Sequence, residues 1–285
     1  MTSTRKVWIG IGAATFVGAS VGGASGQHAG GHKAATPQGS PESAKSTPAG
    51  MQTGGMVAPQ GGEAYLTDGG PRDSRIRIYR DIALMRGHLL VGAELIEQGA
   101  WDDALPHFLH PTEELYVVMS RYIKAHKITP FDKQLLALGQ AVKAKNKAAY
   151  AQAAMVVDQR LTNALTSFRR FMQGPPFTSY TAKTLIEVMK VAKAEYEASI
   201  ENGQFVKPVE YQDSRGFLLY TEQVLEAQAK DYAKIDANKL AELRAILTDV
   251  KRAWPSPVPP TRPVMSPSEV GAKFDAFAVV FQRFF

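Results

Sequence analysis

The sequence predicts an all-α protein of eight helices, arranged as two related four-helix units after a signal peptide and a disordered tail. Beyond residue 70, apolar residues recur at helical spacing, with no convincing strand alternation. The order of helix ends and aromatic positions also repeats along the chain. The first 70 residues have a different composition. We therefore expect four segments, at residues 1–26, 27–70, 71–174 and 175–285.

Residues 1–26 have the features of a secretory signal peptide. Arg5 and Lys6 form a basic start, residues 7–17 form an apolar core, and residues 24–26 offer a cleavage site of small residues. The apolar core is too short and too rich in glycine for a membrane span of about 20 residues. We therefore expect export to the periplasm without stable membrane insertion.

Residues 27–70 are rich in small and polar residues and carry almost no large apolar side chains. Such a segment cannot bury enough apolar surface to offset its ordering entropy, which predicts a flexible linker. Imidazoles and thioethers suit copper, so copper capture by this segment is one alternative, through His28, His32, Met51 and Met56.

The composition excludes several kinds of chemistry. The chain has no cysteine, which excludes disulfides, thiolate metal sites and a cysteine nucleophile. Removal of residues 1–26 takes away two basic residues and no acidic one, leaving 31 Lys and Arg against 27 Asp and Glu. No stretch interleaves aromatic and basic residues, so we expect no nucleic-acid partner. The densest basic run is expected to be the solvated face of a first helix, with an anion site as the alternative: Arg72, Arg75, Arg77, Arg80 and Arg86.

The first half predicts four helices, at about residues 74–98, 101–125, 129–145 and 148–172. Gly99 ends the first helix. Pro111 interrupts or restarts the second, because it lacks a backbone N–H. Thr129 and Pro130 are typical of an N-cap followed by a proline at the first helical position.

The same order recurs after residues 174–176, where Gly-Pro-Pro ends the fourth helix. Residues 200–203 end the fifth helix as residues 96–99 end the first, and Asp236 is expected to cap the seventh. At a shift of 104 residues, aromatic residues stand opposite Trp101, His107 and Tyr116, namely Phe205, Tyr211 and Tyr220. The repeat favours a duplicated four-helix unit, since two docked units bury more surface than one.

A compact cluster of possible metal ligands lies in the second helix, with the spacing H-x-x-H-P-x-E-E: His107, His110, Glu113 and Glu114. If that helix is continuous, His107, His110 and Glu114 share one face, as a site of imidazoles and a carboxylate requires. His88 on the neighbouring first helix can add a ligand. The combination suits zinc, copper or iron.

A structural interpretation competes with the metal site. Pro111 disfavours helix at His110, and a break there would separate the ligands. Glu113 would then only favour a helix N-terminus, and His88 would be a hydrogen-bonded core residue. At the matching positions the second half carries Ala192, Tyr211 and Ser214. A metal site, if the protein has one, is therefore expected in the first half alone.

Two resemblances accompany this cluster. A duplicated helical, exported chain with histidine and carboxylate on early helices resembles the imelysin-type, iron-regulated periplasmic proteins. Gly87 and His88 meet their G-x-H-x-x-E motif in part, and Val91 stands at its carboxylate position. The second resemblance is local, to a tetratricopeptide helix pair, and rests on Gly92, Gly99, Trp101, Ala104 and Phe108. It predicts one close helical hairpin, and it implies a peptide-binding scaffold as an alternative function.

Charged residues of the second half are expected to be solvated or locally paired: Glu195, Glu197, Glu210, Asp213 and Arg215. The chain has no G-x-S-x-G, no H-E-x-x-H and no phosphate loop, so a binding protein is favoured over an enzyme. The sequence therefore predicts a periplasmic helical binding protein whose partner is a metal ion or another envelope protein. The alternative is a helical scaffold or protein-interaction module without metal.

Overall fold

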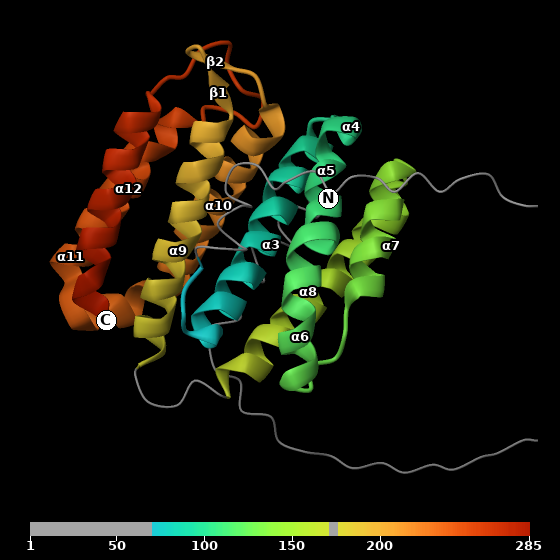
Figure 1. Cartoon of the computed structure of the whole chain (residues 1–285), viewed down its shortest axis with the longest axis horizontal. Coiled ribbons are helices and arrows are strands. Elements are labelled where there is room, and N and C mark those ends of the chain that lie inside the picture. The colour runs from blue at the N-terminus through green and yellow to red at the C-terminus, as the bar shows by residue number, and fades with distance from the viewer. Residues whose placement is uncertain (1–69, 171–175) are drawn as a thin grey trace, which may run out of the picture. The chain divides into compact units, whose positions relative to one another are not determined.

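The computed structural model describes residues 70–170 and 176–285, and these form an almost entirely helical structure (Figure 1). The predicted signal peptide lies outside the described residues. Nearly all of the predicted linker also lies outside them, including His28, His32, Met51 and Met56. The same holds for residues 174 and 175, where the predicted break begins. In the part that the structure describes, no helix combines the length and the hydropathy of a membrane span.

The helices follow the predicted order. In the first half they are α3 (Ser74–Glu97), α4 (Trp101–Ala104), α5 (Pro106–His110), the π-helix η1 (Pro111–Tyr116), α6 (Val117–Ala125), α7 (Asp132–Lys143) and α8 (Lys147–Arg169). In the second half they are α9 (Phe177–Ala198), α10 (Pro208–Ala227), α11 (Ala229–Val250) and α12 (Pro267–Phe281), with two short 3-10 turns, η2 (Lys251–Ala253) and η3 (Gln282–Phe284). With α4 to α6 taken as one interrupted helix, the described residues form eight helices, and the all-α prediction is confirmed.

Helix α3 lies at the centre, between α9 and α10 on one side and the remaining first-half helices on the other (Figure 1). Asp73 caps it by accepting a hydrogen bond from the Arg75 amide, as an N-cap residue does. Every residue from 78 to 96 is buried. The sequence predicted one wide buried face, and the full burial arises because both halves pack on this helix.

Two arginines of the basic run are not solvated, which corrects the sequence-based expectation. Arg80 is fully buried and pairs with Asp81 at 2.8 Å. Arg86 is also buried, and it donates to Asp158 of α8 at 2.5 Å and to Thr162 at 2.8 Å. Buried charges need such partners, so neither residue is a free anion site. Arg86 links α3 to α8, whereas Arg80 pairs within α3.

The second helix is divided at its prolines. Pro106 occupies the first turn of α5, where its missing N–H costs nothing. At Pro111 the backbone remains helical but widens into η1. Because proline cannot donate to the carbonyl four residues earlier and crowds it, a π-turn is a natural accommodation. The break that Pro111 was expected to cause at His110 is therefore absent.

The predicted start of the third helix is wrong. Thr129 and Pro130 precede α7 without capping it, and Asp132 is its first residue. The fully buried Phe131 sets this start, since its ring packs on Tyr116 with a centroid separation of 4.9 Å. Tertiary packing here overrides a local capping signal.

Helix α9 ends earlier than predicted, at Ala198, and a hairpin follows. Strand β1 (Ile200–Glu201) pairs antiparallel with β2 (Gln204–Phe205). Asn202 and Gly203 form the two-residue turn, with φ values of 51° and 71°. Asn-Gly is the preferred pair for such a turn, because both positions need positive φ. The sequence carries this turn signal, and the prediction that residues 200–203 form the end of the fifth helix is wrong.

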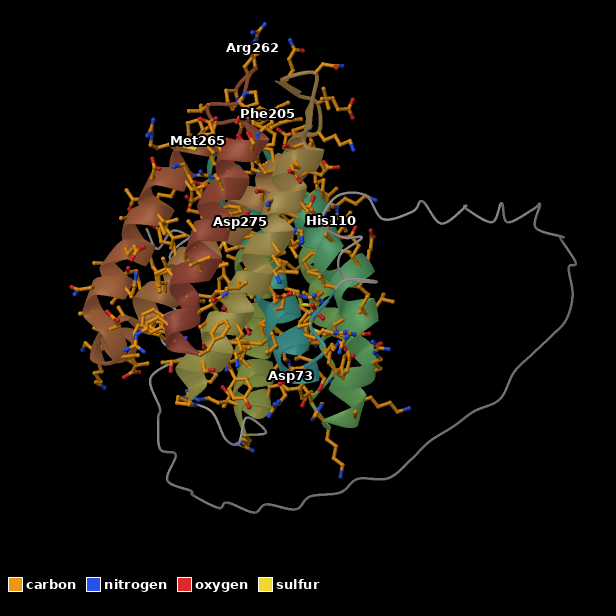
Figure 2. The ribbon with its side chains drawn as sticks, turned by 60° about the vertical axis from the view of Figure 1, so that its left-hand side comes forward. Asp73, His110, Phe205, Arg262, Met265 and Asp275 are labelled. Atoms are coloured by element: carbon orange, nitrogen blue, oxygen red, sulfur yellow. The ribbon has the colours of Figure 1, made fainter. Side chains whose placement is uncertain are left out.

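The remaining caps agree better with the sequence. The predicted Asp236 cap is confirmed: Asp236 has an extended backbone at a kink in α11 and accepts from the Lys239 amide at 3.0 Å. Ser266 and Glu269 form a capping box at the start of α12. The hairpin and the proline-rich loop lie at one end of the described structure, where Phe205 and Met265 both contact Tyr196 (Figure 2).

Candidate metal centre

The crossing of α3 and α10 depends on two glycines. A Cβ atom at Gly216 would lie 2.2 Å from the carbonyl oxygen of Gly87, and one at Gly87 would lie 2.5 Å from the Phe217 ring. No larger residue fits at this backbone contact. The close approach brings His88, next to Gly87, against Asp213 on α10.

A third glycine positions α5 on the opposite side of α3. A Cβ atom at Gly92 would lie 2.6 Å from the Phe108 ring and 3.2 Å from the Cβ of His107. Phe108 is buried and packs edge-to-face on Tyr150 at 5.5 Å. The predicted close hairpin, with Gly92 admitting Phe108, is thus confirmed, and it directs His107 toward α10.

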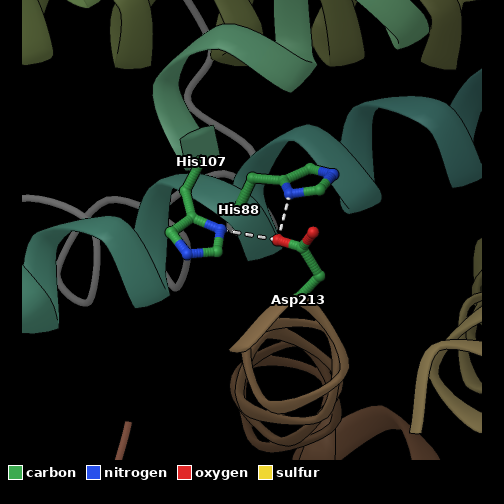
Figure 3. Close-up of side chains that lie close together, drawn as sticks. All are labelled: His88, His107 and Asp213. Atoms are coloured by element: carbon green, nitrogen blue, oxygen red, sulfur yellow. Dashed lines mark hydrogen bonds and ion pairs between the residues drawn. The ribbon is translucent and has the colours of Figure 1, made fainter. Parts of the chain in front are cut away.

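Side chains of two helices, α3 and α5, meet one buried carboxylate on a third, that of Asp213 on α10 (Figure 3). Oδ1 of Asp213 lies 2.5 Å from Nδ1 of His88 and 2.7 Å from Nδ1 of His107. His107 is fully buried, and its Nε2 lies 2.9 Å from Oε1 of Gln212, the residue preceding Asp213. His88 and Asp213 are also buried, so α10 meets both imidazoles in a region without bulk water.

His110 completes the group, and it brings Glu114 alongside. Nδ1 of His110 lies 3.3 Å from Oδ2 of Asp213, and its Nε2 lies 3.9 Å from Glu114 Oε1. The His110 ring centroid is 5.3 Å from that of His88 and 6.4 Å from that of His107. Glu113 is exposed and does not join this group. Of the five predicted site residues, the structure thus gathers the three histidines and leaves Glu114 at the margin.

Burial and charge pairing shift the pKa values of this group in opposite directions. Burial lowers the pKa of His88, although the facing Asp213 raises it in part. Burial by itself would raise the pKa of Asp213, but the surrounding histidines and their hydrogen bonds hold it well below its ordinary value. Asp213 is therefore a carboxylate at neutral pH, and burial favours the neutral, metal-binding form of His88.

The donor set fits a first-row transition metal. One ligand atom from each of His88, His107 and Asp213 lies within 4.8 Å of the others. Four ligands at about 2.0–2.2 Å around a tetrahedral ion are separated by roughly 3.4 Å from one another. The Nδ1–Oδ1 distances of 2.5 and 2.7 Å are those of hydrogen bonds, so an ion would need these side chains to separate by less than about 1 Å.

Sequence reasoning missed the carboxylate and the amide of this group. Asp213 and Gln212 belong to a charged stretch that was expected to be solvated or locally paired, and both are buried. The expectation of a first-half cluster is therefore incomplete, since its central residue comes from the second half. An indirect signal existed: at the 104-residue shift Asp213 stands opposite Leu109, between the two histidines of α5.

Comparison with known proteins gives one result. Residues 178–285, which contain most of α9 and all of α10 to α12, match the model of the iron permease-associated 4-helix bundle domain. No curated protein and no solved structure matches the chain. The matched residues include Asp213 and Gln212, whereas the three histidines precede them. The helical-bundle description of this family agrees with the all-α fold of the described residues.

Proposed function

We propose that this protein is an exported, periplasmic metal-binding protein that takes part in iron acquisition, and that it holds one ion through His88, His107, His110 and Asp213. The observation that carries the proposal is the convergence of three imidazoles on one buried carboxylate. Imidazole and carboxylate ligands together suit iron, zinc and copper.

Iron is the first candidate because of the similarity of residues 178–285 to an iron permease-associated domain. The same description supports a membrane permease as the partner that receives or supplies the ion. The basic and apolar start of the chain, with its small-residue cleavage site, supports export. The ion would then be cargo in the periplasm.

The test is the metal content of the protein isolated from the periplasm without an affinity tag, measured by mass spectrometry. We expect close to one ion per wild-type chain, and loss of that ion in the His107→Ala/His110→Ala double variant and in Asp213→Asn. Glu113→Gln is the matched control, because Glu113 is exposed and outside the group. Added metal should also raise the thermal midpoint, since a ligand at 100 times its Kd stabilises the folded state by about 2.7 kcal/mol.

One result of the same measurements would contradict the proposal. A metal-free wild type whose thermal midpoint is unchanged by iron, zinc or copper would eliminate the proposal. One observation favours the alternative of a helical interaction module: the Nδ1 atoms of His88 and His107 and the Nε2 of His107 already have hydrogen-bond partners. The group would then be an interhelical network, and crosslinking in the envelope would identify the partner.

A further inference from the structure

The ligand group has a buried end and an accessible end. The exposed fraction of the side chain is 0% for His107, 3% for Asp213 and 5% for His88. It rises to 18% for His110 and 30% for Glu114. An ion that arrives from solvent therefore meets Glu114 and His110 before it reaches the other three residues.

The accessible end is also a continuous line of donor atoms. His110 presents one ring nitrogen to each of two carboxylates: Nδ1 lies 3.3 Å from Asp213 inside, and Nε2 lies 3.9 Å from Glu114 outside. An ion bound between Glu114 and His110 is thus one side chain away from the buried carboxylate.

The π-helix explains why Glu114, and not its neighbour, has this position. His110 ends α5, and Glu114 lies four residues later within η1. A π-turn closes through i→i+5 hydrogen bonds and has more than four residues per turn, so residue 114 stays near the direction of residue 110 while residue 113 is rotated further away. Glu113 is turned to solvent on another face, although it differs from Glu114 by only one position.

We propose that Glu114 and His110 form the entry of the site, where Glu114 captures a divalent cation from solvent and brings it to His110, which then holds it together with Asp213, His88 and His107. This inference rests on the proposed metal-binding function and adds an order of events to it. A carboxylate at the rim of a buried site attracts cations and raises the association rate more than it changes the final affinity.

The experiment is stopped-flow loading of the purified protein with Co²⁺, followed by the visible absorbance of the bound ion, in wild type, Glu114→Gln and Glu113→Gln. We expect Glu114→Gln to slow loading by about tenfold at low ionic strength, with an equilibrium Kd within about threefold of wild type. The difference should shrink in about 1 M salt, which screens exposed charges. Glu113→Gln, with the same charge change on the adjacent residue, should load at close to the wild-type rate.

Each other outcome contradicts the entry role. Equal loading rates for Glu114→Gln and Glu113→Gln would show that Glu114 has no special role in entry. Faster release with unchanged loading would make Glu114 a permanent ligand. If wild type does not bind Co²⁺, iron, zinc or copper at all, the proposed function fails and this inference fails with it. If wild type binds but Glu114→Gln behaves as wild type, the inference fails alone.

Discussion

The α3–α5 hairpin and the α9–α10 hairpin occupy matching places in the two predicted halves, yet they use three matching positions differently. The first carries His88, His107 and His110, and the second carries Ala192, Tyr211 and Ser214. Tyr211 donates its hydroxyl to the Ser256 carbonyl oxygen at 2.8 Å, and Ser214 donates to the carbonyl oxygen of Ala192 at 2.6 Å. In the second hairpin, Tyr211 and Ser214 thus form hydrogen bonds to backbone carbonyl oxygens.

The contrast shows that the polar group around Asp213 is divided between the two predicted halves. The second half has no histidine at the matching positions, but its residues 212 and 213 turn toward the imidazoles of the first. The buried ion pair of Arg215 with Glu94, at 2.7 Å, joins the same two helices nearby. Neither half holds the whole group, so the contact between α10 and the α3–α5 hairpin is required for it.

The largest effect should come from removing the shared carboxylate. Asp213→Ala leaves two buried imidazoles without their partner, and loss of one member of a buried charged network costs about 3 kcal/mol or more. Urea unfolding measures this cost as a lower free energy of unfolding. Asp213→Asn should lose less, since the amide oxygen can still accept a hydrogen bond. An Asp213→Ala variant as stable as wild type would show that the network does not hold the halves together.

The next effect concerns the glycine contact that makes the group possible. Gly216→Ala should cost about 2 kcal/mol, because its Cβ meets backbone of α3 and the helices must separate. The control is Gly139→Ala on α7, where the nearest atom to a new Cβ is a Leu109 methyl at 3.2 Å. Urea unfolding compares the two variants. Similar losses in both would mean that the α3–α10 contact is no more demanding than an ordinary helix contact.

A smaller effect is expected at the second-half counterpart of His107. Tyr211→Phe removes one partly buried hydrogen bond to backbone, which costs about 1 kcal/mol. The metal content should stay at the wild-type level, in contrast with His107→Ala/His110→Ala. Metal loss in Tyr211→Phe would contradict the division of roles between the hairpins.

The smallest effect should be at a helix cap, where the halves also differ. Helix α11 is capped at its kink by Asp236, whereas no side chain caps α7. The Lys239 amide, with Arg283, lowers the pKa of Asp236 below its ordinary value of 3.8. A lowered carboxyl pKa stabilises the folded state above the unfolded-state pKa, and this stabilisation is lost as the pH falls through the folded-state pKa.

Asp236→Ala should therefore lower the thermal midpoint slightly at pH 7, and its difference from wild type should shrink as the pH falls below about 3.8. Asp236→Asn is the control, because asparagine caps helices nearly as well as aspartate. A constant difference between wild type and Asp236→Ala from pH 7 to pH 3 would exclude an ionised cap.

The sequence by itself determined the helices, because periodicity, glycine stops and caps act within a few residues. Such local signals predicted the ends of α3 and the cap at Asp236. They also predicted the close helical hairpin at Gly92. It also indicated the three histidines, because they gather on one face of one helix and on its immediate neighbour. Local signals misled at Phe131, where packing overrides a capping signal, and at Pro111, where the backbone widens into a π-turn without a break.

Only the tertiary structure decided which carboxylate the histidines meet. Asp213 is separated from His88 by 125 residues and from His107 by 106, so no spacing within a helix relates them. The pairing of Glu114 with His110 is different, since these residues are four apart on one helix and their shared face was predicted from the spacing. Long-range contacts depend on how whole helices dock, and here two glycines set that docking by allowing backbone to touch backbone.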